Sequence, residues 1–232
     1  IERLPLAQIA AFAAPDAPFK LVGEIGGEGA ISGTAAGAFS GSARLASAGG
    51  SVGYPDSVQK PLLEYSNFSI DAKLQPDSQR VVLAATLANG RLTGDVSASG
   101  TEHALSGELT LTLQDLGVVE LLTTEVAQVK GSIDGRIVLT GNAVDPHIGG
   151  ALTLDGFAAE LPRAGLKLHD GRMRLTAEDG GRFTIDGRVG SGDGMLALRG
   201  GGMLDLSTPV RIALEGEKFL AADIPGARAV IS

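Results

Sequence analysis

Apolar and polar residues alternate with a period of two along most of the chain. One set of alternate positions is aliphatic or Phe, and the other is mainly Arg, Lys, Thr or Asp. The clearest runs in the second half are 135–141, 151–156, 166–169, 172–176, 182–187, 195–200 and 211–216. Because successive side chains of a strand point to opposite faces, these runs predict antiparallel strands with one dry and one wet face.

The first half of the chain shows the same alternation, with residues 68–74 as its clearest run. Asn89-Gly90, Asp170-Gly171 and residues 179–181 are turn-forming pairs or triplets between runs. The short intervals between runs predict up-and-down hairpins rather than long crossovers.

The glycine-rich stretches 23–29 and 190–194 superficially resemble phosphate-binding loops. A phosphate loop needs a following helix whose N-terminus faces the phosphate, whereas β-alternation follows both stretches. Both are therefore predicted to be turns.

A longer repeat is superimposed on the alternation. Ile31-Ser32-Gly33 recurs 108 residues later as Leu139-Thr140-Gly141, and Phe39-Ser40-Gly41 recurs 109 residues later as Ile148-Gly149-Gly150. The chain is therefore expected to hold two β-groove repeats, 1–108 and 109–232, that continue into one another.

Two segments interrupt the β-alternation. Residues 115–126 carry apolar residues at helical spacing after Asp115, a possible N-cap, and residues 6–13 are their counterpart in the first copy. Short helical or irregular crossings are predicted at both places.

Composition decides what the apolar face could be. The chain has 34 Gly, 4% aromatic residues and no Trp, yet 44% of its residues are hydrophobic. Compact cores normally use aromatics to fill volume, and glycines within strands permit sharp sheet curvature. These features favour an all-β, long antiparallel sheet whose curvature leaves an open apolar groove; the U shape of this groove is implied by the family resemblance described below. Alternation alone is equally compatible with the closed core of a sandwich.

The candidate groove lining consists of the apolar positions in the alternating runs of the second copy. Their expected role is uniform apolar lining rather than catalysis. They are Ile137, Leu139, Leu152, Leu154, Leu166, Leu168, Met173, Leu175, Phe183, Ile185, Leu196, Leu198, Ile212 and Leu214.

Charge and candidate chemistry exclude several classes of protein. The net charge of −8 argues against nucleic-acid binding, and the absence of Cys excludes disulfides and thiolate metal sites. His103, His147 and His169 lie far apart in sequence without ligand spacing, so they are interpreted as surface residues. No nucleophile motif is present. We therefore expect no catalytic residue, no metal and no cofactor, and an enzyme is the least expected class.

The ends of the chain suggest a part of a larger protein. The apolar segment 4–14 contains Pro5 and Gln8 and lacks a basic leader, so it is not read as a signal peptide. No stretch approaches the roughly 20 apolar residues of a membrane span. The chain begins at Ile1 and stops within strand-like sequence at 227–232, as expected of a segment.

A series of turn-and-strand motifs in the second copy resembles a known family. The series comprises 131–135, 139–141, 145–150, 161–165, 170–171, 192–196 and 214–225. Its order resembles the C-terminal region of the translocation and assembly module B (TamB-like) family, related to AsmA-like and bridge-like lipid-transfer proteins. The resemblance covers 109–232 well and the first copy weakly, because Ser40-Gly41 lacks the preceding Pro and 52–65 has no good counterpart.

The resemblance implies a β-taco, a long sheet folded into a U with an aliphatic interior. It also implies a protein anchored in the inner membrane of a diderm bacterium and spanning the periplasm. Its expected partners are phospholipid acyl chains and an Omp85-type (TamA-like) outer-membrane barrel.

Three functions remain open from the sequence. The favoured one is a groove that shields phospholipid acyl chains in transport between the two membranes and so supports outer-membrane biogenesis. The second is a chaperone-like groove that receives strands of outer-membrane barrel proteins by edge augmentation, assisting their assembly or secretion. The third is a structural solenoid or sandwich with an adhesive polar exterior. Exposed edge strands could also allow self-association.

Overall fold

The computed structural model is almost entirely β-structure. It describes residues 3–8, 20–33, 39–53, 63–121, 125–142, 144–178, 180–203 and 209–232. Its strands are β1 (Leu4–Pro5), β2 (Lys20–Gly33), β3 (Phe39–Gly53), β4 (Leu63–Gln75), β5 (Ser78–Leu87), β6 (Gly90–Ser99), β7 (Ala104–Leu113), β8 (Ala127–Gly141), β9 (Pro146–Leu161), β10 (Leu166–Ala177), β11 (Arg182–Ser191), β12 (Gly194–Met203), β13 (Arg211–Glu217), β14 (Phe219–Ile224) and β15 (Ala227–Ile231). Two short 3-10 helices, η1 (Gly117–Leu121) and η2 (Pro162–Ala164), lie among the described residues.

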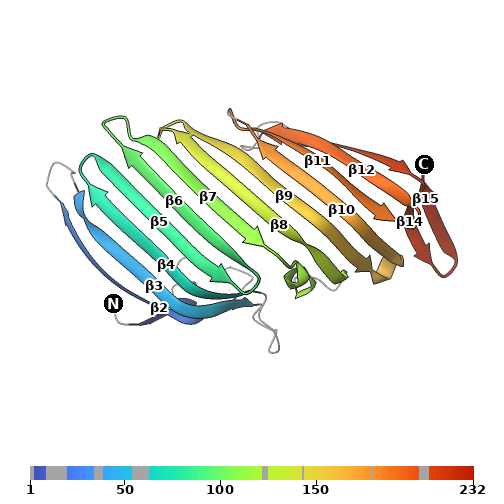
Figure 1. Ribbon diagram of the computed structural model, residues 1–232, viewed down its shortest axis with the longest axis horizontal. Coiled ribbons are helices and arrows are strands. Elements are labelled where there is room, and N and C mark those ends of the chain that lie inside the picture. Colours follow the sequence, from blue (N-terminus) through green and yellow to red (C-terminus); the bar gives the residue numbers. More distant parts are fainter. Residues whose placement is uncertain are drawn as a thin grey trace. The chain divides into compact units, whose positions relative to one another are not determined.

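Strands β1 to β13 form one sheet in sequence order, and β14 pairs with β15 in a separate two-stranded sheet (Figure 1). The strand order is open, running from β1 at one edge to β13 at the other. The pairings within β2–β6 and within β9–β13 are antiparallel throughout. The predicted all-β fold with a long, open, antiparallel sheet is confirmed.

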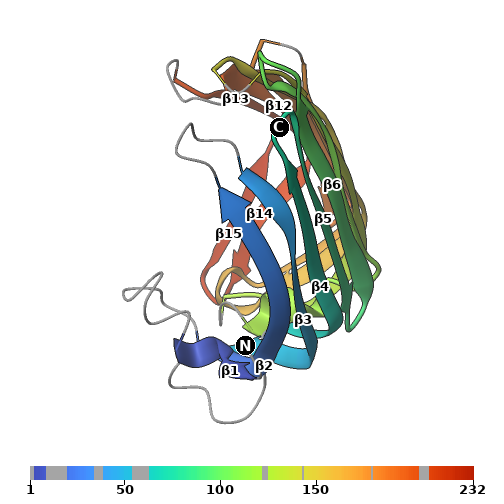
Figure 2. The same cartoon turned by 90° about the vertical axis from the view of Figure 1, so that its left-hand side faces the viewer.

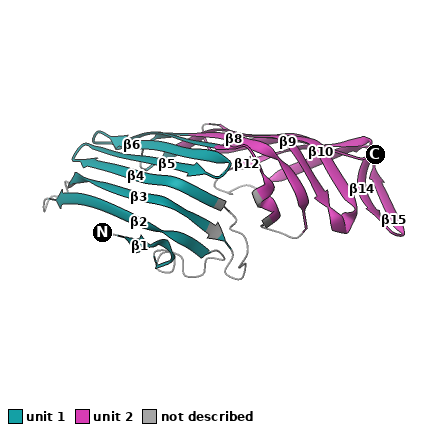
Figure 3. Cartoon of the chain, turned by 60° about the horizontal axis from the view of Figure 1, so that its bottom comes forward, with its two compact units in different colours: residues 1–111, 138–146 teal, residues 112–137, 147–232 magenta. Residues whose placement is uncertain are grey.

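The chain divides into two compact units, coloured separately in Figure 3. Unit 1 comprises 1–111 and 138–146, and unit 2 comprises 112–137 and 147–232. In unit 1, strands β2 to β6 lie side by side and curve along their length (Figure 2). The division into two repeats, 1–108 and 109–232, rests on sequence similarity and stays a prediction.

The turn predictions are partly correct. Strands β5 and β6 are joined through Ala88 and Asn89, and β11 and β12 through Gly192 and Asp193. The turn predicted at Asp170-Gly171 is wrong, because β10 runs through it from Leu166 to Ala177. Asp170 has φ 52°, and the registers with β9 and β11 shift beside it, so the pair forms a β-bulge.

The turn predicted for residues 23–29 is also wrong, since this stretch lies inside β2. Glycine serves close packing of neighbouring strands here, because a Cβ on Gly27 would collide with the carbonyl oxygen of Arg44 in β3. Gly23 has φ 134°, and the register between β2 and β3 shifts between Gly23 and Gly26. The glycines thus build a bulged strand.

The predicted crossing at 115–126 contains η1. Asp115 caps it, because its Oδ1 accepts a hydrogen bond from the Gly117 N–H at 2.8 Å. Residues 6–8 of the predicted crossing at 6–13 are helical, and residues 9–13 lie outside the described part of the chain.

The best-buried cluster of unit 2 lies beneath η1. It consists of Leu116, Val129 and Ala159, with Val119 of η1 packed against it. Glu120 Oε1 also accepts a hydrogen bond from the Val129 N–H at 2.6 Å. The crossing therefore covers the apolar surface where β8 begins and β9 ends.

Candidate functional site

The strand registers of unit 2 bring the predicted lining residues onto one face of the sheet. In one row across β9 to β13, Leu152 lies opposite Leu175, then Ile185, Gly200 and Ile212. Directly opposed residues of antiparallel strands share a face, so these side chains form a continuous apolar row.

The neighbouring row has the same character. Leu154 lies opposite Met173, followed by Gly187, Leu198 and Leu214. These positions are two residues away from the first row on every strand and therefore point the same way.

Further predicted lining residues join this face at both ends of the rows. Leu196 lies opposite Val189, and Leu168 lies opposite Ser191. Phe183 lies opposite Ala177 and Gly202. Leu166 is two residues before Leu168 on β10, so its side chain points to the same face.

The two predicted lining residues of β8, Ile137 and Leu139, belong to different units of the chain. A Cβ on Gly150, which lies opposite Ala177, would sit 2.9 Å from Cα of Ile137, so Ile137 borders the same face. Leu139 is half-buried and belongs to the part of β8 in unit 1.

Exposure along the strands defines two rims of this face. Near the start of β9 and β13, large apolar side chains face solvent, with Ile137 45% and Ile212 56% exposed, although Phe183 at the start of β11 is buried. We call this end the open rim. At the other end, Ala159, Leu166 and Ser191 are buried, and we call it the covered rim.

The covered rim is closed by η1 and by the β14–β15 hairpin. Phe219, the first residue of β14, is buried with 6% exposure. A Cβ on Gly192, in the β11–β12 turn, would lie 3.3 Å from Cβ of Leu220. A Cβ on Gly165, after η2, would collide with the carbonyl oxygen of Asp223. The hairpin therefore packs against the ends of β10, β11 and β12.

An apolar pocket of about 160 Å³ lies between the two rims. It is lined by Leu154, Phe157, Met173, Val189, Leu196 and Leu198, with Gly171, Arg172, Gly187 and Arg188. Phe157 and Val189 are not among the lining residues predicted from the sequence. Asp155 and Gly156 form a bulge opposite Arg172. The extra residue puts Phe157 on the same face as Leu154, although strict alternation would place it on the other face. Val189 continues the alternation of β11 and could have been found by extending that run.

The opposite face of unit 2 is polar and carries cross-strand ion pairs. Arg199 lies 3.5 Å from Asp186 and 3.8 Å from Glu215, and Arg172 lies 3.9 Å from Asp155. All of these side chains are largely exposed, so each pair contributes little stability. The ion pairs instead identify this face as the one in contact with water.

Unit 1 repeats this division into an apolar and a polar face. Leu45 of β3 lies opposite Ile70 of β4, which lies opposite Leu83 of β5. On the alternate face, Arg80 Nε donates to Asp95 Oδ1 at 2.8 Å, and this charged hydrogen bond lowers the pKa of Asp95.

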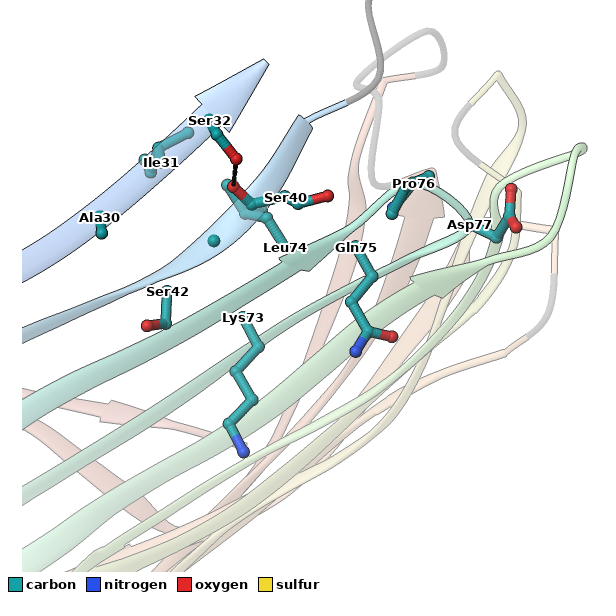
Figure 4. Close-up of a pocket in the computed structure, with 11 residues that line it drawn as sticks. Ala30, Ile31, Ser32, Ser40, Ser42, Lys73, Leu74, Gln75, Pro76 and Asp77 are labelled. Atoms are coloured by element: carbon teal, nitrogen blue, oxygen red, sulfur yellow. Dashed lines mark hydrogen bonds between the residues drawn. The ribbon is translucent and has the colours of Figure 1, made fainter. Parts of the chain in front are cut away.

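Unit 1 also has a hollow of about 910 Å³ at the ends of β2, β3 and β4 (Figure 4). Its lining mixes Ile31 and Leu74 with Lys73, Gln75 and Asp77. The Ser32 hydroxyl within it donates to the Ser40 carbonyl at 3.2 Å. This mixed lining lacks the apolar character of the pocket in unit 2.

Among the histidines, His169 has defined partners. Its Nδ1 lies 2.8 Å from Asp170 Oδ2 and its Nε2 lies 3.2 Å from the Gly192 carbonyl oxygen. The Asp170 carboxylate and then the Gly192 carbonyl raise the pKa of His169. Within the described ranges, no three His, Asp or Glu side chains are grouped to hold a metal. The helices described there are also too short to cross a membrane.

Comparison with known proteins supplies the family. A model of the TamB N-terminal domain matches residues 1–154. The matched domain is N-terminal, whereas the resemblance in the sequence pointed to the C-terminal region, and the match covers the whole first copy. No curated protein and no solved structure matches. Because the family model covers more than half of the 232 residues, the chain belongs to the TamB family.

Proposed function

We propose that the apolar face of unit 2 shields the acyl chains of phospholipids as they pass between the inner and outer membranes. The observation that carries the proposal is the aliphatic face across β9 to β13 with large side chains exposed at its open rim. Soluble proteins rarely expose contiguous apolar surface unless it meets a partner or a lipid. Membership of the TamB family, within the translocation and assembly module, supports this assignment.

The chemistry of the face suits a lipid tail better than a polar ligand. Leu, Ile and Met side chains offer no directional hydrogen bonds, so a bound chain gains about 0.8 kcal/mol for each methylene removed from water. The exposed ends of the strands at the open rim leave a charged headgroup in water. Such a face discriminates poorly between headgroups.

The cellular setting belongs to the same proposal. The chain acts in the periplasm of a diderm bacterium, within a protein anchored in the inner membrane. An Omp85-type outer-membrane barrel of the TamA kind receives the lipid, and the flow of lipid supports outer-membrane biogenesis. Family membership supports this setting.

A pair of neighbouring substitutions on β13 tests the proposal. Leu214 points to the apolar face and is 59% exposed, so Leu214→Asp places a charge there without burying it. Ala213 is exposed on the polar face opposite Arg199, so Ala213→Asp is the matched control. The measurement is the amount of phospholipid that co-purifies with each protein.

We expect the wild type and Ala213→Asp to retain lipid and Leu214→Asp to lose most of it. The affinity for the acyl chain falls about fourfold for each methylene that the charge prevents from being buried. Equal lipid in all three proteins, or none in the wild type, would contradict the proposal.

The position of β13 at one edge of the described sheet supports the chaperone-like function as a second candidate. β13 ends the strand order of the sheet, and its residues are almost all exposed. An unpaired edge can accept a strand from another chain. Crosslinks from β13 to outer-membrane barrel proteins, in place of lipid, would favour this candidate.

A further inference from the structure

The apolar face of unit 2 is not uniform, because a pocket opens into it. The pocket of about 160 Å³ lies among β9, β10, β11 and β12. Gly187 stands between Met173 and Leu198 in its row, where every other residue from Leu154 to Leu214 is large and apolar. A Cβ on Gly187 would lie 3.0 Å from the carbonyl oxygen of Arg172 and 3.3 Å from Cβ of Met173, so Met173 packs closely against this glycine and the two residues together line the pocket.

A second glycine shapes one wall of the pocket. Phe157 lies directly opposite Gly171, and a Cβ on Gly171 would sit 2.8 Å from Cβ of Phe157. The Phe157 side chain therefore occupies the place that a side chain at position 171 would need. Phe157 and Leu154 form the wall on β9, and Leu196 and Leu198 form the facing wall on β12.

The pocket lies between the two rims, next to the covered rim. One step beyond Val189 and Leu196 is the opposed pair Ser191 and Gly194. Ser191 is completely buried, and Phe219 of β14 is almost so. In the other direction, the face leads to the exposed side chains of the open rim. A linear apolar molecule that enters from the open rim thus ends at the pocket.

We propose that this pocket holds the methyl end of a phospholipid acyl chain. The inference rests on the proposed function and adds a fixed position for the chain end. An enclosed apolar cavity of about 150 Å³ binds benzene, so this open pocket of similar volume has room for about six carbons. An extended acyl chain spans about 15 Å, half the hydrocarbon core, so its remaining carbons lie along the face toward the open rim.

The charges beside the pocket exclude a headgroup as its occupant. Arg172 and Arg188 are the charged residues among its lining, and they lie opposite one another in register. They occupy the alternate positions next to Met173 and Gly187, so their side chains point to the polar face. The pocket thus offers apolar side chains and main chain to its occupant.

Two phosphatidylcholine probes test the position of the chain end. Each carries one diazirine, either at the terminal carbon of an acyl chain or at its middle, and is loaded into the purified protein before irradiation. Adducts are mapped by peptide mass spectrometry in the wild type, in Leu198→Phe and in Ala213→Phe. Leu198 lines the pocket, whereas Ala213 is exposed on the polar face opposite Arg199.

We expect the terminal probe to label the pocket residues Met173 and Leu196 preferentially, and the central probe to label residues nearer the open rim. Leu198→Phe should lower terminal labelling of the pocket at least about fourfold, the factor for one buried methylene, while Ala213→Phe on the polar face leaves it unchanged. Leu154→Phe narrows the pocket from the facing wall and should act like Leu198→Phe, and urea unfolding checks that each variant is folded.

The possible failures are distinguishable. Labelling of the apolar face by both probes at the same positions, or an equal effect of Leu198→Phe and Ala213→Phe, would overturn the fixed chain end and leave the lipid-shielding function intact. The absence of labelling on the apolar face with either probe would overturn the proposed function and the inference together.

Discussion

At the scale of single residues, polar side chains at the covered rim carry consequences for stability. Ser191 Oγ is fully buried and has no hydrogen-bond partner among the described residues. A buried unsatisfied hydroxyl costs about 1–3 kcal/mol, so serine is unfavourable at this position when the hairpin is packed. His169, on the polar face near the same rim, has two partners that favour its protonated form.

The first prediction concerns Ser191. Ser191→Ala removes the buried hydroxyl and should raise the free energy of unfolding by about 1 kcal/mol. Ser97→Ala is the control, because Ser97 Oγ is exposed and donates to the Ser106 carbonyl, and its effect should stay within about 0.5 kcal/mol. Urea unfolding measures both. A marked loss of stability in Ser191→Ala would mean that the hydroxyl is hydrogen-bonded at this rim.

The second prediction concerns pH. The folded-state pKa of His169 lies above its ordinary value, chiefly because of Asp170, so protonation stabilises the fold. This contribution is fully present below the unfolded-state pKa near 6.5 and is lost as the pH rises through the raised folded pKa. The difference in unfolding free energy between wild type and His169→Gln, measured from pH 5 to 8, should therefore shrink with rising pH. A difference that is constant or grows would show that His169 does not gain from protonation.

At the scale of elements, bulges decide which side chains meet on the apolar face. The Asp170-Gly171 bulge keeps Leu168 and Met173 on the same face although they are five residues apart. An Asp-Gly pair favours positive φ in a hairpin turn and in a bulge alike, so local sequence does not distinguish the two. The same ambiguity explains why the glycines of β2 resembled a turn.

A substitution at Asp170 tests the bulge. Asp170 has φ 52°, a region that β-branched residues avoid, so Asp170→Val should lower the free energy of unfolding by about 1–2 kcal/mol. Asp170→Asn removes the charge but tolerates this backbone conformation, and it should cost clearly less. Thermal unfolding of both variants provides the comparison. Equal losses would indicate that the carboxylate, rather than the backbone, sets the stability of this site.

At the scale of the whole molecule, the division of the sheet into an apolar and a polar face could be predicted from the sequence. The burial of the covered rim by other elements could not. The period of two identifies the strands, and strand registers confirm that Leu152, Leu175 and Ile185 share a row. The sequence does not reveal that η1 and β14 bury the covered rim, because that depends on non-local packing. The pocket at Gly187 could not be predicted either, since it arises from neighbours on four strands.

The most direct test of the lipid-shielding function is a photo-crosslinking scan in living cells at four consecutive positions of β9. Leu152 and Leu154 lie on the apolar face, whereas Thr153 lies opposite Arg174 on the polar face and Asp155 lies 3.9 Å from Arg172. We predict phospholipid adducts at 152 and 154 and none at 153 and 155. Adducts at all four positions, or at none, would contradict a lipid-bearing face.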